Sequence, residues 1–407
     1  MVMPKVLQIN VCFNVYSTGR IVSELSAYVY REGWQTFAAF RSGTFIDDHI
    51  TELVPIGRGT DKYFHFIKSF FFDAHGLGSR NATKALVNRI RAINPDIIHI
   101  HNLHGYYLNY EILFQYLNQL HIPVIITAHD CWTFTGHCAH FVTAGCYKWE
   151  SGCHHCQLKG KYPKSLIDRS ASNYSKKKKL FLDNNNIHIV AVSEWLGTMI
   201  SRSFLRKKDI SVVSNGVDIQ LFRPLPSVPK LEVIPWNKKV ILAVSSVWYK
   251  DKGLDDYFLL AEKIPKDMVI CMVGLSKKQM NSLPSNIIGI SRTANVEEMV
   301  RIYNRADVVL SLSYAESFGL SIAEAMACGT PAVVYDNTAL PELISAGTGR
   351  VVKTGDVDGV ADAVVDLLSK DVQETSRMCR ERAVQQYNKE DTYKKYFQLY
   401  LDLMGRA

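Results

Sequence analysis

Short runs of β-branched and apolar residues alternate with longer helical patterns along almost the whole chain. This alternation is typical of parallel sheets, because parallel neighbours need a crossover connection that is usually a helix. The strands expected in the first half are 6–11, 36–40, 96–101, 123–128, 188–193 and 210–213. Those expected in the second half are 240–245, 268–273, 308–312 and 332–335. The sequence therefore predicts an α/β protein.

A break near the middle divides this pattern into two sets. The segment 224–236 carries four of the 13 prolines and is predicted to be a linker. We therefore expect a Rossmann-like domain at 1–220 and a second one at 221–390, facing each other across a cleft. A final helical segment, 391–407, has aromatic residues on one face and is expected to cross back onto the first domain.

Composition excludes several classes of protein. Hydrophobic residues make up 47% of the chain and charged residues 21%, with a net charge of +8, which argues against disorder, collagen and coiled coil. No apolar run approaches the ~18 to 20 residues of a membrane-spanning helix. The first ten residues lack the apolar core of a secretory signal, so the sequence predicts a cytoplasmic location.

Two carboxylates eight positions apart follow the expected strand 308–312. Glu316 and Glu324 could lie up to about 12 Å apart on a helix, which suits hydroxyls at the two ends of a nucleotide sugar. The diphosphate between them would accept hydrogen bonds from the amides of Phe318, Gly319 and Leu320 at a helix N-terminus. The alternative is that Glu316 caps the helix and Glu324 is a solvated helix residue.

The string from Glu316 to Pro331 resembles the Glu-x7-Glu signature of retaining glycosyltransferases of family 4. Further matching motifs are Ser214-Asn215-Gly216-Val217-Asp218 with Phe222 and Pro224, Lys252-Gly253, and His129-Asp130. The resemblance spans nearly the full chain. It implies the GT-B architecture of two facing Rossmann-like domains, and transfer of a sugar from a nucleotide-diphosphate donor whose base is unknown.

The same resemblance implies roles for individual residues. Glu316 would hold hydroxyls of the donor sugar, Glu324 the ribose and Lys252 the diphosphate. His129 would lie near the donor sugar, positioning it or stabilising charge at the reacting carbon. The residues alone leave another interpretation of His129 open, that of a core histidine with its hydrogen bonds satisfied.

Other candidate donor contacts are less regular. Asn215 belongs to the matching motif, whereas Val247 stands where many relatives carry a phosphate-binding Arg, and Lys250 could supply the missing charge. The expected loop 14–20 after the first strand contains Gly19 and Arg20, of which Arg20 is a candidate anion contact.

The sequence predicts catalysis without a divalent metal. No Asp-x-Asp motif follows a strand, and Asp255-Asp256 lies in a helical pattern. Protein donors are therefore expected to neutralise the leaving diphosphate. Retention of configuration follows from the resemblance only.

A cysteine-rich insertion occupies 131–156. Cys138, Cys146, Cys153 and Cys156 have spacing that suits a structural zinc site, and a neighbouring histidine could replace one cysteine. Unligated thiols and disulfides remain as alternatives. Such an insertion after His-Asp resembles that of some bacterial polysaccharide-assembly transferases.

Two features suggest a lipid-linked acceptor. The segment 63–72 is rich in aromatic residues, and Lys176 to Lys179 form a run of positive charge. Together they could hold the protein peripherally on the inner face of the plasma membrane. The alternatives are a solvated helix face for the lysines and a core position for the aromatics. The polar run from His99 to His104 is expected to line the cleft.

The sequence therefore predicts a glycosyltransferase of bacterial surface-polysaccharide assembly, acting on a glycan or lipid-linked saccharide. A sugar-nucleotide 2-epimerase and a non-catalytic sugar-nucleotide binder are the alternatives within this architecture. A zinc-containing nucleic-acid binder is a third, but no clustered basic recognition element is present, so no nucleic-acid partner is expected.

Overall fold

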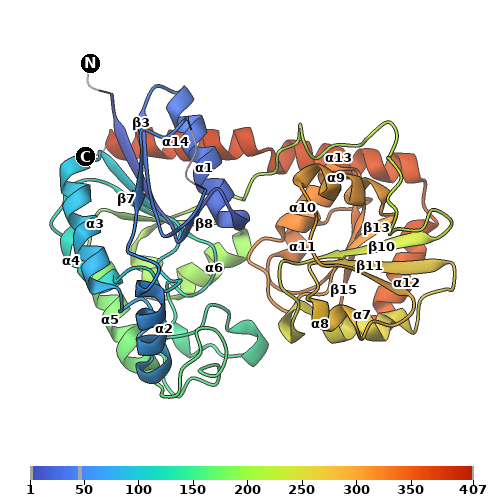
Figure 1. The fold of residues 1–407 in the computed structure, drawn as a ribbon, viewed down its shortest axis with the longest axis horizontal. Helices are drawn as coiled ribbons and strands as arrows, with labels where there is room; N and C mark the ends of the chain where they lie inside the picture. Colours follow the sequence, from blue (N-terminus) through green and yellow to red (C-terminus); the bar gives the residue numbers. More distant parts are fainter. Residues whose placement is uncertain (1–2, 45–47, 406–407) are drawn as a thin grey trace. The chain divides into compact units, whose positions relative to one another are not determined.

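The computed structural model describes residues 3–44 and 48–405. The chain forms two compact units (Figure 1). The first unit consists of Met1–Val213 and Tyr393–Ala407, and the second of Ser214–Thr392.

The first unit is built around a parallel sheet with strand order β5-β3-β1-β6-β7-β8-β9. Its strands are β1 (Lys5–Ile9), β2 (Cys12–Phe13), β3 (Gln35–Phe40), β4 (Ser42–Gly43), β5 (Glu52–Pro55), β6 (Ile97–Ile100), β7 (Val124–Ala128), β8 (Ile187–Ala191) and β9 (Asp209–Val212). Its helices are α1 (Tyr16–Arg31), α2 (Asp61–Phe72), α3 (Arg80–Ile93), α4 (Tyr110–Leu117), α5 (Ser170–Leu182) and α6 (Glu194–Arg202). β2 and β4 pair with each other outside the main sheet.

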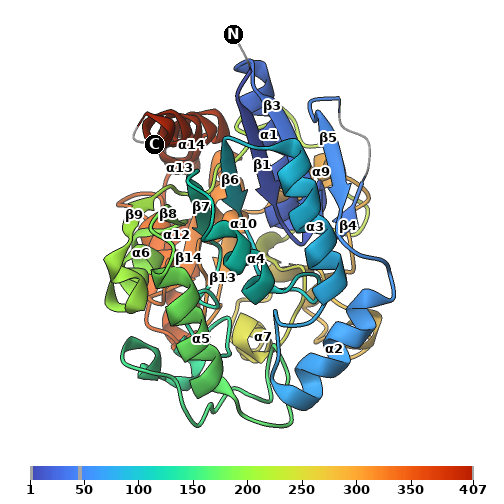
Figure 2. The same cartoon turned by 90° about the vertical axis from the view of Figure 1, so that its left-hand side faces the viewer.

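Helices cover both faces of this sheet. On one face, α1 and the end of α14 (Lys389–Met404) pack against inward-facing residues of β1, β6, β7 and β8. On the other face, α3, α4 and α5 lie side by side (Figure 2). Because both faces are covered, the central strands β6 and β7 are buried along their whole length, which explains their continuous apolar character.

The second unit repeats the plan with strand order β12-β11-β10-β13-β14-β15. Its strands are β10 (Lys239–Val244), β11 (Met268–Val273), β12 (Ile287–Ile290), β13 (Val308–Ser311), β14 (Ala332–Tyr335) and β15 (Gly349–Val352). Its helices are α7 (Leu254–Ala261), α8 (Lys277–Met280), α9 (Val296–Arg305), α10 (Leu320–Ala327), α11 (Leu340–Leu343), α12 (Val357–Leu368), α13 (Val372–Tyr387) and the first turn of α14. α7 and α12 cover one face of the sheet, and α10 packs on α13 and α9 on the other (Figure 1).

Two parallel, helix-covered sheets confirm the predicted α/β class with two Rossmann-like domains. The sequence did not predict β5, β12 or β15, and each of these is a strand at the edge of its sheet. Edge strands are short and partly exposed, so they lack the continuous apolar run that marks a central strand. No helix in the described part of the chain is long and apolar enough to cross a membrane.

A buried polar chain fixes the C-terminal helix to the first unit. His99 in β6 is fully buried, and its Nδ1 lies 2.6 Å from the hydroxyl of Tyr400 on α14. Its Nε2 lies 2.8 Å from Thr127 Oγ1, which in turn contacts the hydroxyl of Tyr396. Residues 301 positions apart in sequence thereby share one hydrogen bond inside the core.

We expect Tyr400→Phe to lower the free energy of unfolding by about 1–3 kcal/mol, because it removes the partner of a buried ring nitrogen. Tyr400→Ala should cost about 3–5 kcal/mol, since it also leaves a cavity. Urea unfolding measures both changes. Leu401→Ala, at a 41% exposed position on the same helix, is the control. Equal stability of Tyr400→Phe and wild type would contradict the assigned role of this hydrogen bond.

Candidate active site

The order of the strands in the second unit reverses between β10 and β13. In open parallel sheets the ligand crevice lies outside the carboxyl ends of the strands at such a switch point. Lys252 follows β10 and Glu316 follows β13, so the fold brings the two side chains to this place. Lys252 Nζ lies 2.5 Å from Glu316 Oε1, and both side chains remain partly exposed.

Local backbone geometry fixes Lys252. The short turn Lys250–Lys252 docks on the loop after β13, where Tyr314 N–H donates to Asp251 O over 2.9 Å. Gly253 follows with a φ of 73°, and a Cβ there would lie 2.1 Å from Leu312 O. Only glycine fits this position, which explains the Lys-Gly pair in the sequence.

Lys252 is held as a cation. Burial alone would lower the pKa of its ammonium group, but the adjacent Glu316 carboxylate outweighs that effect and raises the pKa. A fixed positive charge beside a partly exposed carboxylate can bind an anion and a hydroxyl side by side.

The helix whose N-terminal amides were predicted to bind the diphosphate is α10. It begins at Leu320, so Phe318 and Gly319 precede it. The reason is Gly319, whose φ of 98° places it in the left-handed region and outside the helix. The Phe318 side chain is buried and packs edge-on against Tyr387 with ring centroids 5.6 Å apart. Leu320 thus provides the first helical amide of the predicted diphosphate contact.

The two predicted carboxylates have different surroundings. Glu316 N–H donates to Thr338 Oγ1 over 2.9 Å, which fixes the loop that carries it. Glu324 is 9% exposed and accepts a 2.8 Å hydrogen bond from the hydroxyl of Tyr303 on α9, so it is not the solvated residue of the alternative interpretation. Thr338 and Tyr303 were not among the residues predicted from the sequence. Tyr303 lies on the buried face of α9, but no local signal marks Thr338.

The other residues of the second unit that were predicted to contact the donor lie in different segments. Lys250 is exposed in the same turn as Lys252, and Val247 is 59% exposed. The segment around Asn215 packs on the junction of α13 and α14. There, Val217 N–H donates to Tyr387 O at the end of α13, and Asp218 pairs with Lys389 of α14 at 2.8 Å.

His129 follows β7 in the first unit and contacts a second histidine. Its Nε2 lies 3.3 Å from His101 Nδ1, and His101 Nε2 lies 2.9 Å from Gln8 Oε1. The Gln8 amide nitrogen already donates to Val22 O, so Oε1 must accept a hydrogen bond from His101 Nε2–H. His101 Nδ1 is then the acceptor for His129 Nε2–H. Burial lowers the pKa of His129 to about 4, so the ring is neutral near pH 7 and acts through hydrogen bonds rather than as a cation.

The predicted loop around Gly19 and Arg20 is wrong. α1 begins at Tyr16, so both residues lie in the early turns of a helix. A Cβ on Gly19 would lie 3.1 Å from Cys12 Sγ, and this close approach to β2 explains the glycine. Arg20 is exposed on the helix.

The structure does not support the predicted zinc site of Cys138, Cys146, Cys153 and Cys156. Among residues 3–44 and 48–405, no group of three or more His, Cys, Asp or Glu side chains is arranged to hold a metal ion. The thiols make hydrogen bonds instead: Cys138 bonds Cys156, and Cys153 Sγ accepts from Gly136 N–H over 3.2 Å.

Two buried charged groups hold the cysteine-rich segment. Asp73 accepts a 2.5 Å hydrogen bond from His137 Nδ1 and one of 2.8 Å from Arg169 N–H. Lys177 is 1% exposed, donates to the carbonyls of Trp132 and Thr135, and has its pKa lowered to about 7 by burial. Lys176 pairs with Glu111 at 2.8 Å. Two lysines of the run from Lys176 to Lys179 are therefore engaged within the protein, whereas Lys178 and Lys179 are exposed.

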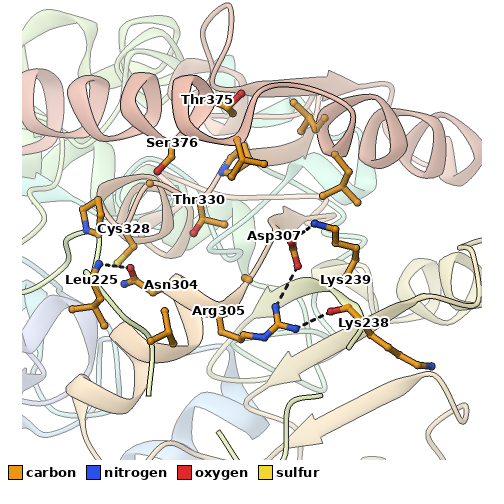
Figure 3. A pocket seen from close by; sticks show the side chains of 18 of the residues that line it. Leu225, Lys238, Lys239, Asn304, Arg305, Asp307, Cys328, Thr330, Thr375 and Ser376 are labelled. Atoms are coloured by element: carbon orange, nitrogen blue, oxygen red, sulfur yellow. Dashed lines mark hydrogen bonds and ion pairs between the residues drawn. The ribbon is translucent and has the colours of Figure 1, made fainter. Parts of the chain in front are cut away.

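A cavity of about 660 Å³ lies elsewhere in the second unit (Figure 3). It is bordered by Lys239, Asp307 and Pro331, which stand at the amino ends of β10, β13 and β14. Its charged groups bind one another, since Asp307 accepts from Lys239 and Arg305 (Figure 3). This cavity is at the opposite edge of the sheet from Lys252 and Glu316, so we do not assign it to the active site.

Comparison with known proteins identifies the family of this chain. Residues 19–221 match the family model "Glycosyltransferase Family 4" and residues 229–386 match "Glycosyl transferases group 1". The chain belongs to these glycosyltransferases and has the GT-B fold. It is 22% identical over 278 residues to the putative colanic acid biosynthesis glycosyl transferase WcaC of Escherichia coli K12, covering 66% of each chain.

Another relative is N-acetyl-alpha-D-glucosaminyl L-malate synthase of Bacillus anthracis, 28% identical over 53% of this chain and 60% of the relative. The chain thus matches about two thirds or less of the length of these relatives. Among solved structures, sucrose-phosphate synthase from Thermosynechococcus elongatus has a TM-score of 0.75 at 17% identity, covering 99% of this chain and all of the other. HepE from Anabaena, solved with UDP-glucose, has a TM-score of 0.64 at 16% identity, covering 98% of this chain and 99% of the other.

We expect the free energy of unfolding to fall as the pH drops from about 6.5 toward 4, because the unfolded chain binds protons that buried histidines do not. His129 should contribute a slope of about 1.4 kcal/mol per pH unit in that window. Urea titrations at about pH 7 and about pH 5 measure the slope.

His129→Gln keeps a donor for His101 and should make the slope shallower. The exposed His121→Asn is the matched control and should leave it unchanged. If His129→Gln leaves the slope unchanged, then His129 has the same pKa in the folded and the unfolded chain, which would contradict this prediction.

Proposed function

We propose that this protein transfers a sugar from a nucleotide-diphosphate sugar to a glycan or lipid-linked saccharide, with retention of configuration. The carrying observation is the Lys252–Glu316 contact at the switch point of the second sheet. The UDP-glucose complex of HepE supports a donor of this chemical class.

The donor would be held by charge and by backbone amides. Lys252 and Lys250 would neutralise the diphosphate, and Gly319 and Leu320 would present amides to it at the positive end of α10. Phe318 would support this turn through its buried ring.

Carboxylates would bind the two ends of the donor. Glu316 would accept hydrogen bonds from hydroxyls of the sugar, and Glu324 from those of the ribose. In the first unit, neutral His129 would position the sugar by a hydrogen bond. Asn215 and Arg20 remain proposed contacts of the donor. Gly19 remains one as well, because a residue without a Cβ would admit a close approach of the donor.

The chemistry would need no protein nucleophile and no divalent cation. The bond between the anomeric carbon and the diphosphate breaks, and its electron pair leaves with the nucleoside diphosphate. The acceptor oxygen adds on the same face, and its proton passes to the leaving phosphate. Lys252 and the amides of α10 stabilise the charge that develops on the leaving group. The similarity to WcaC supports a role in bacterial surface-polysaccharide assembly.

We expect Glu316→Gln, which keeps shape but removes charge, to lower kcat for transfer by about 10²-fold or more, as loss of one preorganised electrostatic contact does elsewhere. UDP-, GDP-, ADP- and dTDP-sugars are first screened by thermal stabilisation, and transfer of the stabilising donor is then assayed in EDTA. Glu262→Gln removes an exposed carboxylate from the same unit and serves as the control.

Full activity of a folded Glu316→Gln variant would contradict the assigned site. Loss of wild-type transfer in EDTA, restored by Mn²⁺, would contradict metal independence. Conversion of the donor to its 2-epimer without an acceptor would favour an epimerase instead.

The helix α2 provides a surface for a lipid-linked acceptor. Most of its aromatic and aliphatic side chains face solvent, with exposed fractions from 44% to 73%: Tyr63, Phe64, Phe66, Ile67, Phe71 and Phe72. The opposite face is fixed by His65, whose Nε2 accepts from Gly76 N–H and Gly78 N–H at 3.1 and 3.2 Å. An exposed apolar face of this kind, flanked by Lys62 and Lys68, suits the interface of an anionic bilayer. We propose that α2 is the membrane contact.

We expect the double variant Phe64→Ser with Phe71→Ser to lower the affinity for vesicles of phosphatidylglycerol and phosphatidylethanolamine by about tenfold or more, since each phenylalanine would otherwise bury apolar area. Co-sedimentation measures the binding. Val372→Ser, at a 69% exposed position of the second unit, is the control. Unchanged vesicle binding by the double variant would contradict this contact.

A further inference from the structure

A segment without helix or strand, residues 159–169, lies against the C-terminal end of α2. The last carbonyls of a helix have no partner within the helix, and here the carbonyl of Phe70 accepts from Leu166 N–H over 2.8 Å. The segment is tied to the same end of α2 a second time. Asp73 directly follows the helix and accepts from Arg169 N–H over 2.8 Å. The backbone of the segment is therefore fixed to α2 at two points.

Aromatic rings form a third contact between α2 and this segment. Phe66 of α2 packs edge-on against Tyr106 with ring centroids 5.5 Å apart. Tyr106 in turn packs edge-on against Tyr162 of the segment at 6.3 Å. Phe66 and Tyr162 are both exposed, so the row of rings reaches solvent on each of the two elements. The exposed parts of α2 and of the segment thus lie side by side on the first unit.

The segment adds exposed apolar side chains to those of α2. Leu166, whose backbone contacts Phe70, is 52% exposed, and Ile167 is 42% exposed. Phe71 and Phe72, which directly follow Phe70, are 48% and 54% exposed. A patch of large apolar side chains drawn from two adjoining elements is costly to leave in water, and it therefore marks an interaction surface.

Positive charge surrounds these apolar side chains. The segment has one acidic residue, Asp168, and its carboxylate accepts from Cys156 N–H over 2.7 Å and from Ser170 N–H over 2.9 Å. Its basic side chains are all exposed. They are Lys159, Lys161, Lys164 and Arg169. With four basic residues and one acidic residue, the segment has a formal charge of +3.

An anionic bilayer satisfies both properties of this surface at once. At a membrane interface, apolar side chains enter the boundary between headgroups and acyl chains, while neighbouring lysines attract the negative headgroups. A soluble anion would account for the lysines but would leave the apolar side chains in water. A neutral bilayer would account for the apolar side chains but not for the charge.

We propose that α2 and the 159–169 segment form one membrane-docking surface, in which Leu166 and Ile167 enter the bilayer and the lysines of the segment select anionic phospholipids. This inference rests on the membrane contact proposed for α2. It adds a second element to that contact and names the residues that would recognise the lipid. All of them belong to the first unit.

Vesicles of two compositions test the charged part of this surface. Lys161→Gln with Lys164→Gln should lower the affinity for vesicles containing phosphatidylglycerol by about tenfold or more, since each lysine near an anionic surface adds to binding. The weaker binding to pure phosphatidylcholine should be unchanged. Co-sedimentation measures both affinities. Lys394→Gln with Lys395→Gln removes two exposed charges from α14 and is the matched control for net charge.

A second pair of substitutions tests the apolar part. Leu166→Ser with Ile167→Ser should lower binding to both kinds of vesicle by about tenfold or more, because less apolar area enters the bilayer. Val365→Ser with Val372→Ser removes two exposed apolar side chains from the second unit and is the matched control. Thermal unfolding confirms that each variant folds.

Each possible outcome bears on the inference. Wild-type binding by either segment variant, or an equal loss in its control, would overturn it. If Phe64→Ser with Phe71→Ser loses binding but the segment variants do not, α2 alone is the contact. If the wild type binds no vesicle, both contacts fail, whereas transfer to a soluble saccharide still tests the proposed enzymatic function. Self-association that Leu166→Ser with Ile167→Ser abolishes, without vesicle binding, would assign the surface to a second copy of the chain.

Discussion

The reversal of strand order is the constraint on which both halves of this protein depend. Where a parallel sheet grows in both directions from one strand, the loops after neighbouring strands turn to opposite faces and leave space between them. In the second unit this reversal lies between β10 and β13, and it brings Lys252 to Glu316. In the first unit it lies between β1 and β6, and His101 follows the second of these strands.

Buried polar contacts then hold these edges in place. His99 links the first sheet to α14, Asp73 links α2 to the cysteine-rich segment, and Lys177 links α5 to the loop after β7. Each of these groups is fully or almost fully buried, so removing a partner would leave an uncompensated polar or charged group. Such contacts fix the loop backbone precisely enough to present a few side chains to a ligand.

The central strands and most helices could be predicted because their apolar periodicity is a local property. Two predicted helix boundaries differ from those in the structure. Gly319 delays the start of α10, and α1 begins at Tyr16, inside the segment expected to be a loop. The four cysteines suggested zinc by spacing alone, but spacing does not reveal that Cys153 accepts from Gly136 and that Cys138 bonds Cys156. Spacing also did not reveal that Lys177, within the run of four lysines, is buried.

The sequence by itself determined the alternation of strands and helices and the motif residues Lys252, Glu316 and His129, because each of these is written in neighbouring positions. Tertiary structure alone decided that Tyr303 bonds Glu324 and that His104 lies within hydrogen-bond distance of both Tyr162 and Asp130. These partners lie between 21 and 58 positions apart, and their meeting depends on crossover connections and strand order rather than on any local pattern.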